Sequence, residues 1–307
     1  MESAEVIKKM KLTLGTNCGF AINRYIEPEV WTRIVAKELG LYHVQFVADL
    51  LNPFLPESYI ENQVKRLQKS IKEYGISVDS VFTSAFTRVN HLMNPDREAR
   101  KIWLKWFKDF FTIASRLGAK SGGSHFGIMT FDTYNDPAKR AFIIDEAVKL
   151  WQELTFFAQD LGFECLIFEP ISVEREMANT IEESLELMNR VNENCGVPMR
   201  ICLDVGHAPH PSQRDPYEWI TRLGKYSPVI HLQQTVMHRS NHWPFIPEYN
   251  EQGIIKPDKV IRALEESGAE EALLLFEISH REHSDTDYRV VEDLKVSAEY
   301  WRQYIKE

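Results

Sequence analysis

Eight short runs of β-forming residues alternate with longer helical patterns from one end of the chain to the other. This order is typical of repeated βα units around a parallel sheet, because neighbouring parallel strands can be joined only by a crossover. Runs such as CLIF before Glu169 and LLLF before Glu277 are almost wholly apolar, as expected for strands buried on both faces. The predicted strands are Lys11–Thr16, His43–Ala48, Ser77–Thr83, Ala119–His125, Glu164–Glu169, Met199–Asp204, Val229–Gln233 and Ala272–Ile278.

Proline and glycine mark where the intervening helices begin and end. Proline fits the first turn of a helix, and glycine just past the last turn can adopt the left-handed conformation. No linker rich in Pro, Gly or Ser divides the 307 residues. The chain is therefore predicted to be one (β/α)₈ barrel domain over residues 1–307, an architecture of roughly 250 residues plus extensions. The predicted helices are Pro28–Leu39, Glu57–Tyr74, Pro95–Leu117, Pro137–Leu161, Thr180–Glu193, Pro257–Glu266 and Asp287–Ile305.

Charge and hydropathy narrow the classes of partner. The formal charge is −9, from 45 acidic and 36 basic residues, which gives no electrostatic reason to expect binding to nucleic acid or to an anionic membrane. No run approaches the roughly 18 consecutive apolar residues of a membrane span, and the first residues lack the apolar core of a signal peptide. The four cysteines show no regular spacing. We therefore expect a soluble, cytoplasmic protein with a small polar ligand.

Polar residues lie at the ends of four successive predicted strands. In a barrel of this type the functional groups lie at the carboxyl ends of the strands, where Glu169, Asp204, His231 and Glu277 are found. Three carboxylates in an apolar setting are unfavourable unless a cation compensates them. Oxygen-rich coordination with one imidazole favours Mn²⁺, Mg²⁺ or Co²⁺, so one divalent metal ion is predicted here. The alternative is that each acid pairs with an Arg or Lys and that the histidine is a core residue.

The series Glu169, Asp204-x-x-His207, His231 and Glu277 resembles that of the xylose-isomerase-like TIM barrels, which include ketose 3-epimerases and sugar isomerases. The resemblance spans nearly the whole chain. It implies that the three acids and His231 bind one divalent metal ion. It also implies that Glu169 and Glu277 act as acid and base on opposite sides of a substrate carbon, and that His207 contacts substrate oxygens. The family further suggests a homo-oligomer, either a dimer or a tetramer.

Three residues outside this series are predicted to contact the substrate. His125 lies in GGSHFG after the fourth strand, where glycine permits close backbone approach to a ligand. Arg175, with Glu176, lies in the loop after the fifth strand and could reach hydroxyls or a phosphate; a surface ion pair would explain the two charges equally well. Arg239 resembles the arginine that the epimerases carry after the seventh strand, although the spacing here is longer.

Gln233 and Gln234 set the expected reaction. Acidic or basic residues are common at this place in the epimerases, whereas HLQQT resembles the apiose-isomerase-like branch. Amides there would hydrogen-bond a neutral sugar without adding charge, so Gln233 is predicted to bind substrate. We expect aldose–ketose isomerisation of a small sugar or sugar phosphate, by proton transfer through an enediolate. A ketose 3-epimerase is the alternative.

Two further reactions are alternatives for a barrel of this type. Inosose-type dehydration begins with the same proton abstraction. An endonuclease IV-like nuclease needs an Asp-x-His pair after the seventh strand and a basic rim, but residues 232–257 contain no aspartate and the net charge disfavours binding to phosphate backbones.

The stretch from Thr235 to Gln252 is predicted to be an irregular loop at the rim of the barrel that could close over the ligand.

Overall fold

Eight parallel strands close into a barrel in the computed structural model, which describes residues 10–207, 213–282 and 284–305. All eight predicted strands are confirmed, with every boundary within two residues of its predicted place. The strands are β1 (Lys11–Asn17), β2 (His43–Val47), β3 (Ser77–Phe82), β4 (Ser121–His125), β5 (Cys165–Glu169), β6 (Met199–Asp204), β7 (Val229–Leu232) and β8 (Glu271–Phe276).

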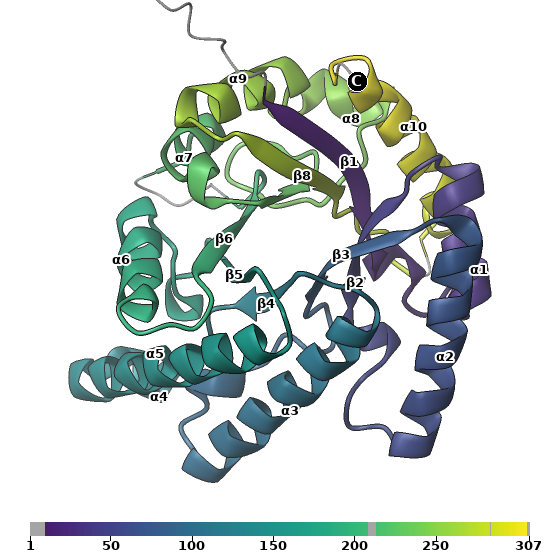
Figure 1. Cartoon of the computed structure of the whole chain (residues 1–307). Helices are drawn as coiled ribbons and strands as arrows, with labels where there is room; N and C mark the ends of the chain where they lie inside the picture. The colour runs from purple at the N-terminus through teal and green to yellow at the C-terminus, as the bar shows by residue number, and fades with distance from the viewer. Residues whose placement is uncertain (1–9, 208–212, 283, 306–307) are drawn as a thin grey trace, which may run out of the picture.

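The strands pair in chain order, and β1 also pairs with β8 to close the ring. This closing register runs from Lys11 opposite Glu271 to Thr16 opposite Phe276. Helices surround the strands in the same order (Figure 1). They are α1 (Pro28–Arg33), α2 (Glu57–Tyr74), α3 (Arg97–Arg116), α4 (Phe131–Asn135), α5 (Pro137–Asp160), α6 (Ile181–Asn192), α7 (Pro216–Leu223), α8 (Pro247–Gln252), α9 (Pro257–Ser267) and α10 (Val290–Arg302).

Each of the seven predicted helices corresponds to a helix of the structure. The glycine that follows the predicted helix has the expected positive φ at Gly40, Gly75, Gly118, Gly162 and Gly268, whereas Gly196, after Thr180–Glu193, does not. Gly75 and Gly268 follow α2 and α9 with φ of 68° and 80°, in the left-handed region. The predicted helix Pro28–Leu39 is divided, because α1 passes into a π-helical turn, η2 (Ile34–Glu38), in which the Leu39 N–H donates to the carbonyl of Ile34. Short 3₁₀ turns add η1 (Cys18–Ala21), η3 (Ala48–Leu50), η4 (His91–Met93), η5 (Glu174–Glu176), η6 (Gly224–Tyr226) and η7 (Asp287–Arg289).

Three short helices were not predicted. Helix α7 has eight residues, too few for hydrophobic periodicity to identify it. Its start is nevertheless marked, because Asp215 accepts a hydrogen bond from the Tyr217 N–H at 2.9 Å and Pro216 occupies the first turn. Helix α8 lies inside the stretch Thr235–Gln252, so the prediction of an irregular loop there is wrong for its last six residues. Helix α4 directly precedes α5.

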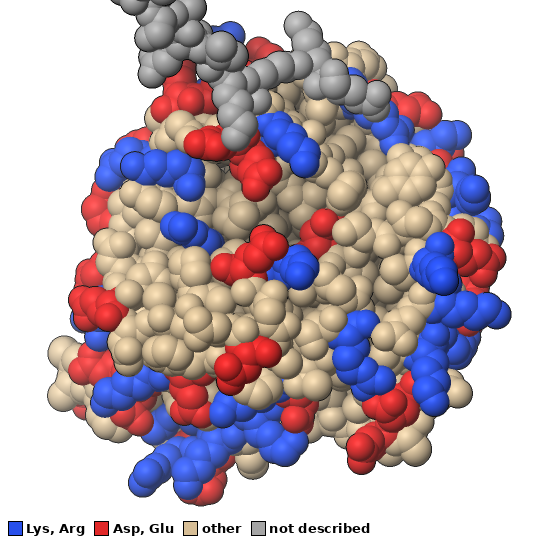
Figure 2. Space-filling view, viewed as in Figure 1, with Lys and Arg blue, Asp and Glu red and all other residues tan. Residues whose placement is uncertain are grey.

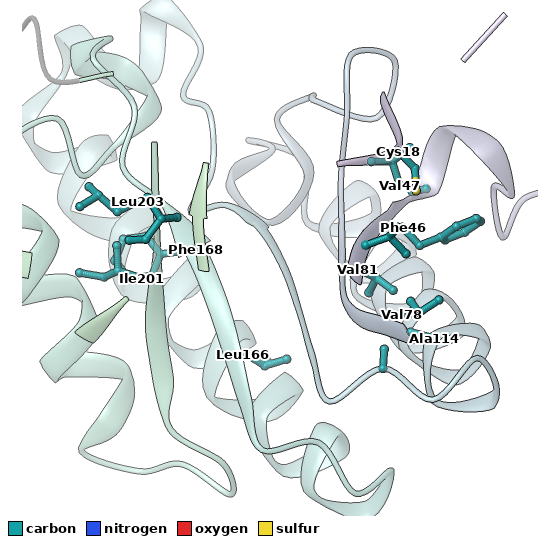
Figure 3. Close-up of a cluster of buried hydrophobic side chains, with 14 of the residues drawn as sticks. Cys18, Phe46, Val47, Val78, Val81, Ala114, Leu166, Phe168, Ile201 and Leu203 are labelled. Atoms are coloured by element: carbon teal, nitrogen blue, oxygen red, sulfur yellow. The ribbon is translucent and has the colours of Figure 1, made fainter. Parts of the chain in front are cut away.

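Side chains on each strand alternate between two apolar layers. Outward-facing residues pack under the helices, and Figure 3 shows Phe168 of β5 together with Ile201 and Leu203 of β6 in this layer. The inward-facing residues form a smaller cluster within the barrel. Because alternate residues of a strand share a face, the positions two residues beyond the inner cluster on β5 to β8 also point inward. The inner cluster consists of Phe82, Cys165, Ile167, Cys202, Val229 and Leu275.

Acidic and basic side chains are interspersed over the face shown in Figure 2, without an extended patch of one sign. Of the helices that the structure describes, none has the length and apolar character needed to cross a membrane.

Candidate active site

The inward-pointing positions at the ends of β5 to β8 bring four polar side chains together. Glu169 ends β5, Asp204 ends β6, His231 lies in β7, and Glu277 directly follows β8. One potential ligand atom from each lies within 4.8 Å of the others, so the group could hold a metal ion. The first three side chains are buried and Glu277 is partly exposed. The strand alternation thus gathers all four predicted ligands at one point.

His231 presents one ring nitrogen to the acids and holds the other in a fixed hydrogen bond. Its Nε2 lies 2.8 Å from Oε1 of Gln45, an oxygen that also accepts from Nδ2 of Asn17 at 2.7 Å. Because an amide oxygen can only accept, Nε2 carries the proton of the neutral ring. Nδ1 then faces Oε1 of Glu169 at 3.0 Å and Oε2 of Glu277 at 3.2 Å. A nitrogen between two carboxylates holds either a proton or a metal ion, and an outer partner such as Gln45 orients a histidine for metal binding.

The charges of the cluster also shift one another's pKa. Burial raises the pKa of Asp204. Burial alone would lower the pKa of His231, but neighbouring Cys202 and Glu277 raise it well above its usual range. Burial alone would raise the pKa of Glu277, yet the charge of His231 lowers it. Negative charge therefore predominates here, and the donor set fits a divalent cation.

Gln233 hydrogen-bonds the carboxylate of Asp204 and does not line the cavity. Its side chain is fully buried, and its Nε2 lies 3.0 Å from both carboxylate oxygens of Asp204. The Gly206 N–H also donates to Asp204 Oδ1, at 2.6 Å. The predicted contact between Gln233 and substrate therefore does not fit the structure, because its amide is already used to orient a carboxylate. Gln234, likewise buried, ties the following loop through Asn250.

His242, in the loop after β7, is a site residue that the sequence interpretation missed. Its Nδ1 lies 3.1 Å from the carbonyl oxygen of Glu277 and must donate to it. Its Nε2 accepts from Nε2 of Gln233 at 3.3 Å and lies 3.4 Å from Nε2 of His207. With Asp204, these two histidines form a second group that could hold a metal ion. A histidine in a loop that follows a site strand was the available signal.

A cavity of about 470 Å³ adjoins this cluster. Its wall includes Glu277, His207 and His242, together with Phe86 and Arg88 from the loop after β3. The volume is typical of pockets for small ligands. Of the residues predicted to contact substrate, His207 lines this cavity.

His125 is buried beside the cavity and does not line it. Its Nε2 lies 3.0 Å from the carbonyl oxygen of Val89, and its Nδ1 lies 3.0 Å from the hydroxyl of Ser124. Burial lowers the pKa of His125 to about 3, so the ring is neutral and donates from Nε2. The predicted substrate contact of His125 is replaced by support of the backbone at Val89.

Arg175 and Arg239 also lie outside the cavity wall. Arg175 donates to the carbonyl oxygen of Met129 at 3.1 Å and stands over the ring of Phe131, 5.1 Å from its centre. Arg239 is exposed at the surface. Neither arginine is brought to the metal-ligand cluster.

Replacing Gln45 with leucine is expected to weaken divalent-metal binding about 10- to 100-fold, because the proton of His231 loses the acceptor that keeps it on Nε2. Competition against a fluorescent chelator measures the change. Gln68→Leu, on the outer face of α2 where Gln68 donates to the carbonyl of Arg116, is the control and should bind metal normally. Unchanged affinity in Gln45→Leu would show that Gln45 does not orient His231.

Known proteins share the sequence pattern and the fold of this chain. Residues 34–303 match the family model described as xylose isomerase-like TIM barrel. A D-erythrulose 1-phosphate 3-epimerase of Brucella abortus (strain 2308) is 33% identical over 301 residues, which cover 96% of this chain and 97% of that protein.

Two solved structures show the same fold. A xylose isomerase-like protein from Rhodospirillum rubrum ATCC 11170 has a TM-score of 0.87 at 23% identity, covering 95% of this chain and 99% of that one. A D-psicose 3-epimerase from Clostridium cellulolyticum H10 has a TM-score of 0.71 at 15% identity, covering 97% and 99%. The family model and the epimerase relative show that the chain belongs to the xylose isomerase-like TIM barrel family, as an enzyme of the isomerase and epimerase class.

Proposed function

We propose that this enzyme is a metal-dependent 3-epimerase of a short ketose phosphate. The observation that carries the proposal is the pair Glu169 and Glu277, which face the same nitrogen of His231 at 3.0 and 3.2 Å beside the cavity. The Brucella relative, similar over nearly its whole length, has this activity by name. The donor set favours Mn²⁺, Co²⁺ or Mg²⁺.

In the proposed mechanism the two glutamates exchange roles across one carbon. When bound, the divalent ion would polarise the ketose carbonyl and so acidify the C–H bond at C3. One glutamate removes the C3 proton to give an enediolate, and the other, protonated, returns a proton to the opposite face. His207 and His242 line the cavity next to Glu277 and hydrogen-bond the substrate oxygens. Solvent then restores the starting protonation of both acids.

Epimerisation replaces aldose–ketose isomerisation as the favoured reaction for two reasons. The first is structural, since the amides of Gln233 and Gln234 are buried and bound within the protein, so they give no argument for a particular sugar. The second is chemical, since an aldehyde cannot form at a C1 that carries a phosphate ester. With a ketose 1-phosphate, C3 is the carbon beside the carbonyl whose proton exchange yields a stable product.

Incubated in D₂O with D-erythrulose 1-phosphate, the metal-loaded enzyme is expected to produce L-erythrulose 1-phosphate with deuterium at C3 in the first turnover. The incoming proton comes from a glutamate that has equilibrated with solvent, so each inverted molecule carries the label. Proton NMR at C3, combined with a chiral assay of the dephosphorylated product, measures both events.

Other labelling patterns identify the competing reactions. Deuterium at C1 or C2 of an aldose–ketose pair, formed from a ketose that is free at C1, would establish isomerisation. A product lighter by one water would establish dehydration. Inversion without label would contradict proton transfer by Glu169 and Glu277.

A further inference from the structure

The cavity wall contains an arginine with unused donors. Arg88 pairs through Nη2 with Glu176, and the exposed fractions of the two side chains are 45% and 5%. Within the described ranges Arg88 makes no other hydrogen bond or ion pair. Since a guanidinium carries five N–H donors in a planar fork, most of them remain available to a ligand.

The backbone around Arg88 is anchored on its C-terminal side. The carbonyl oxygen of Val89 accepts from His125 at 3.0 Å, and Nδ2 of Asn90 donates to the carbonyl oxygen of Ile128 at 2.7 Å. The carboxylate of Glu176 fixes the side chain itself. Arg88 therefore loses little conformational freedom when it binds a ligand.

The other arginine of the wall uses more of its donors within the protein. Of the described cavity-lining residues, Arg24 and Arg88 are the arginines. Arg24 donates through Nε to Asp287 at 2.6 Å and through Nη2 to the carbonyl oxygen of His280 at 2.7 Å. Each arginine pairs with one carboxylate, but Arg24 uses two donor groups within the protein and Arg88 uses one, so Arg88 keeps more N–H donors for an anion.

We propose that Arg88 binds the phosphate group of the substrate and thereby sets the preference for phosphorylated ketoses. The inference rests on the proposed function and names the residue that would select its substrate. A guanidinium fork matches phosphate oxygens bidentately, and the same cavity is lined by Glu277 and His207 of the reaction centre. Ser172, which also lines the cavity on the loop that carries Glu176, adds a hydroxyl donor.

Inorganic phosphate is the probe for the first test, because its binding is measured without turnover. We expect Arg88→Met to raise the Kd of phosphate about 10- to 100-fold by titration calorimetry, as charge-assisted hydrogen bonds are lost. The effect should appear with and without added Mn²⁺, since phosphate held only by the metal would need the metal. Arg66→Met, which removes an Arg–Glu pair with Glu29 outside the cavity, is the matched control and should leave Kd unchanged.

Removing Arg88 leaves Glu176 buried without its partner, so a second variant is needed. Arg88→Met combined with Glu176→Gln removes both charges, and phosphate binding should still be lost. Glu176→Gln alone should keep phosphate binding within a few-fold. If the double variant binds phosphate like the wild type, the loss in Arg88→Met came from the stranded carboxylate and the proposal is wrong.

The second test separates this proposal from the proposed function. Arg88→Met should raise KM for erythrulose 1-phosphate about 10- to 100-fold more than it raises KM for free erythrulose, with partial recovery in Arg88→Lys. An enzyme that epimerises both ketoses equally well would overturn the role of Arg88 while the 3-epimerase assignment stands. Phosphate binding that depends on Arg88, in a protein without epimerase activity, would support the role of Arg88 and overturn the 3-epimerase assignment.

Discussion

Replacing Glu277 with glutamine is expected to lower kcat by about 10²- to 10⁴-fold, the usual contribution of a positioned acid or base, with much less change in substrate binding. Glutamine keeps the shape of the side chain and can still coordinate through its oxygen, but it cannot carry a proton. Glu169→Gln should lose a comparable factor. The measurement is steady-state kinetics at matched metal content, determined by elemental analysis of each preparation.

The labelling pattern of these variants is a sharper test than the rate. If each glutamate serves one face of C3, a single variant can still remove and return the proton of one epimer. Glu277→Gln should therefore wash deuterium into one epimer without inverting it, and Glu169→Gln should do so with the other. Glu271→Gln, at the opposite end of β8, is the control and should keep normal turnover. Near-normal kcat in Glu277→Gln would remove that residue from the acid–base pair.

Removing the divalent ion is expected to abolish turnover, and Mn²⁺, Co²⁺ or Mg²⁺ should restore it. Three carboxylates converge on His231 as a site for the ion, and without the ion the C3 proton is not acidified. Asp204→Asn should prevent the recovery, because the new amide loses a charge and places an NH₂ group against the NH₂ group of Gln233 that now donates to Asp204.

Thermal unfolding gives a readout of this site that is independent of activity. A ligand that binds only the folded state stabilises it by mass action. Saturating Mn²⁺ should therefore raise the Tm of the wild type and leave the Tm of Asp204→Asn nearly unchanged. Full activity in a sample shown by elemental analysis to lack metal would contradict the prediction.

The four proposed metal ligands were accessible from sequence because each is the polar residue at the end of an apolar strand. Alternation along a strand and the shared direction of parallel strands are enough to bring such residues together. Their supporting contacts were not accessible in the same way. Gln45 and His231 are 186 positions apart, and no local pattern indicates that an amide on β2 will reach β7.

The loop residues show where sequence interpretation fails. Arg175 was predicted to reach the substrate, yet its neighbour Glu176 is the residue that turns inward, to Arg88. Met177 and Ala178 follow with positive φ of 63° and 55°, so the backbone there departs from any regular period. In such a segment a shift of one residue decides which side chain meets the cavity, and neither helix nor strand periodicity predicts it.

The pairing of β1 with β8 has a consequence for the order of events during synthesis. Lys11 to Thr16 leave the ribosome early, but their partners Glu271 to Phe276 are among the last strand residues to emerge. Until then one edge of β1 stays open in the nascent chain, and Glu277, the final proposed ligand, has not been made. The proposed metal site can therefore be complete only after nearly all of the chain has been translated.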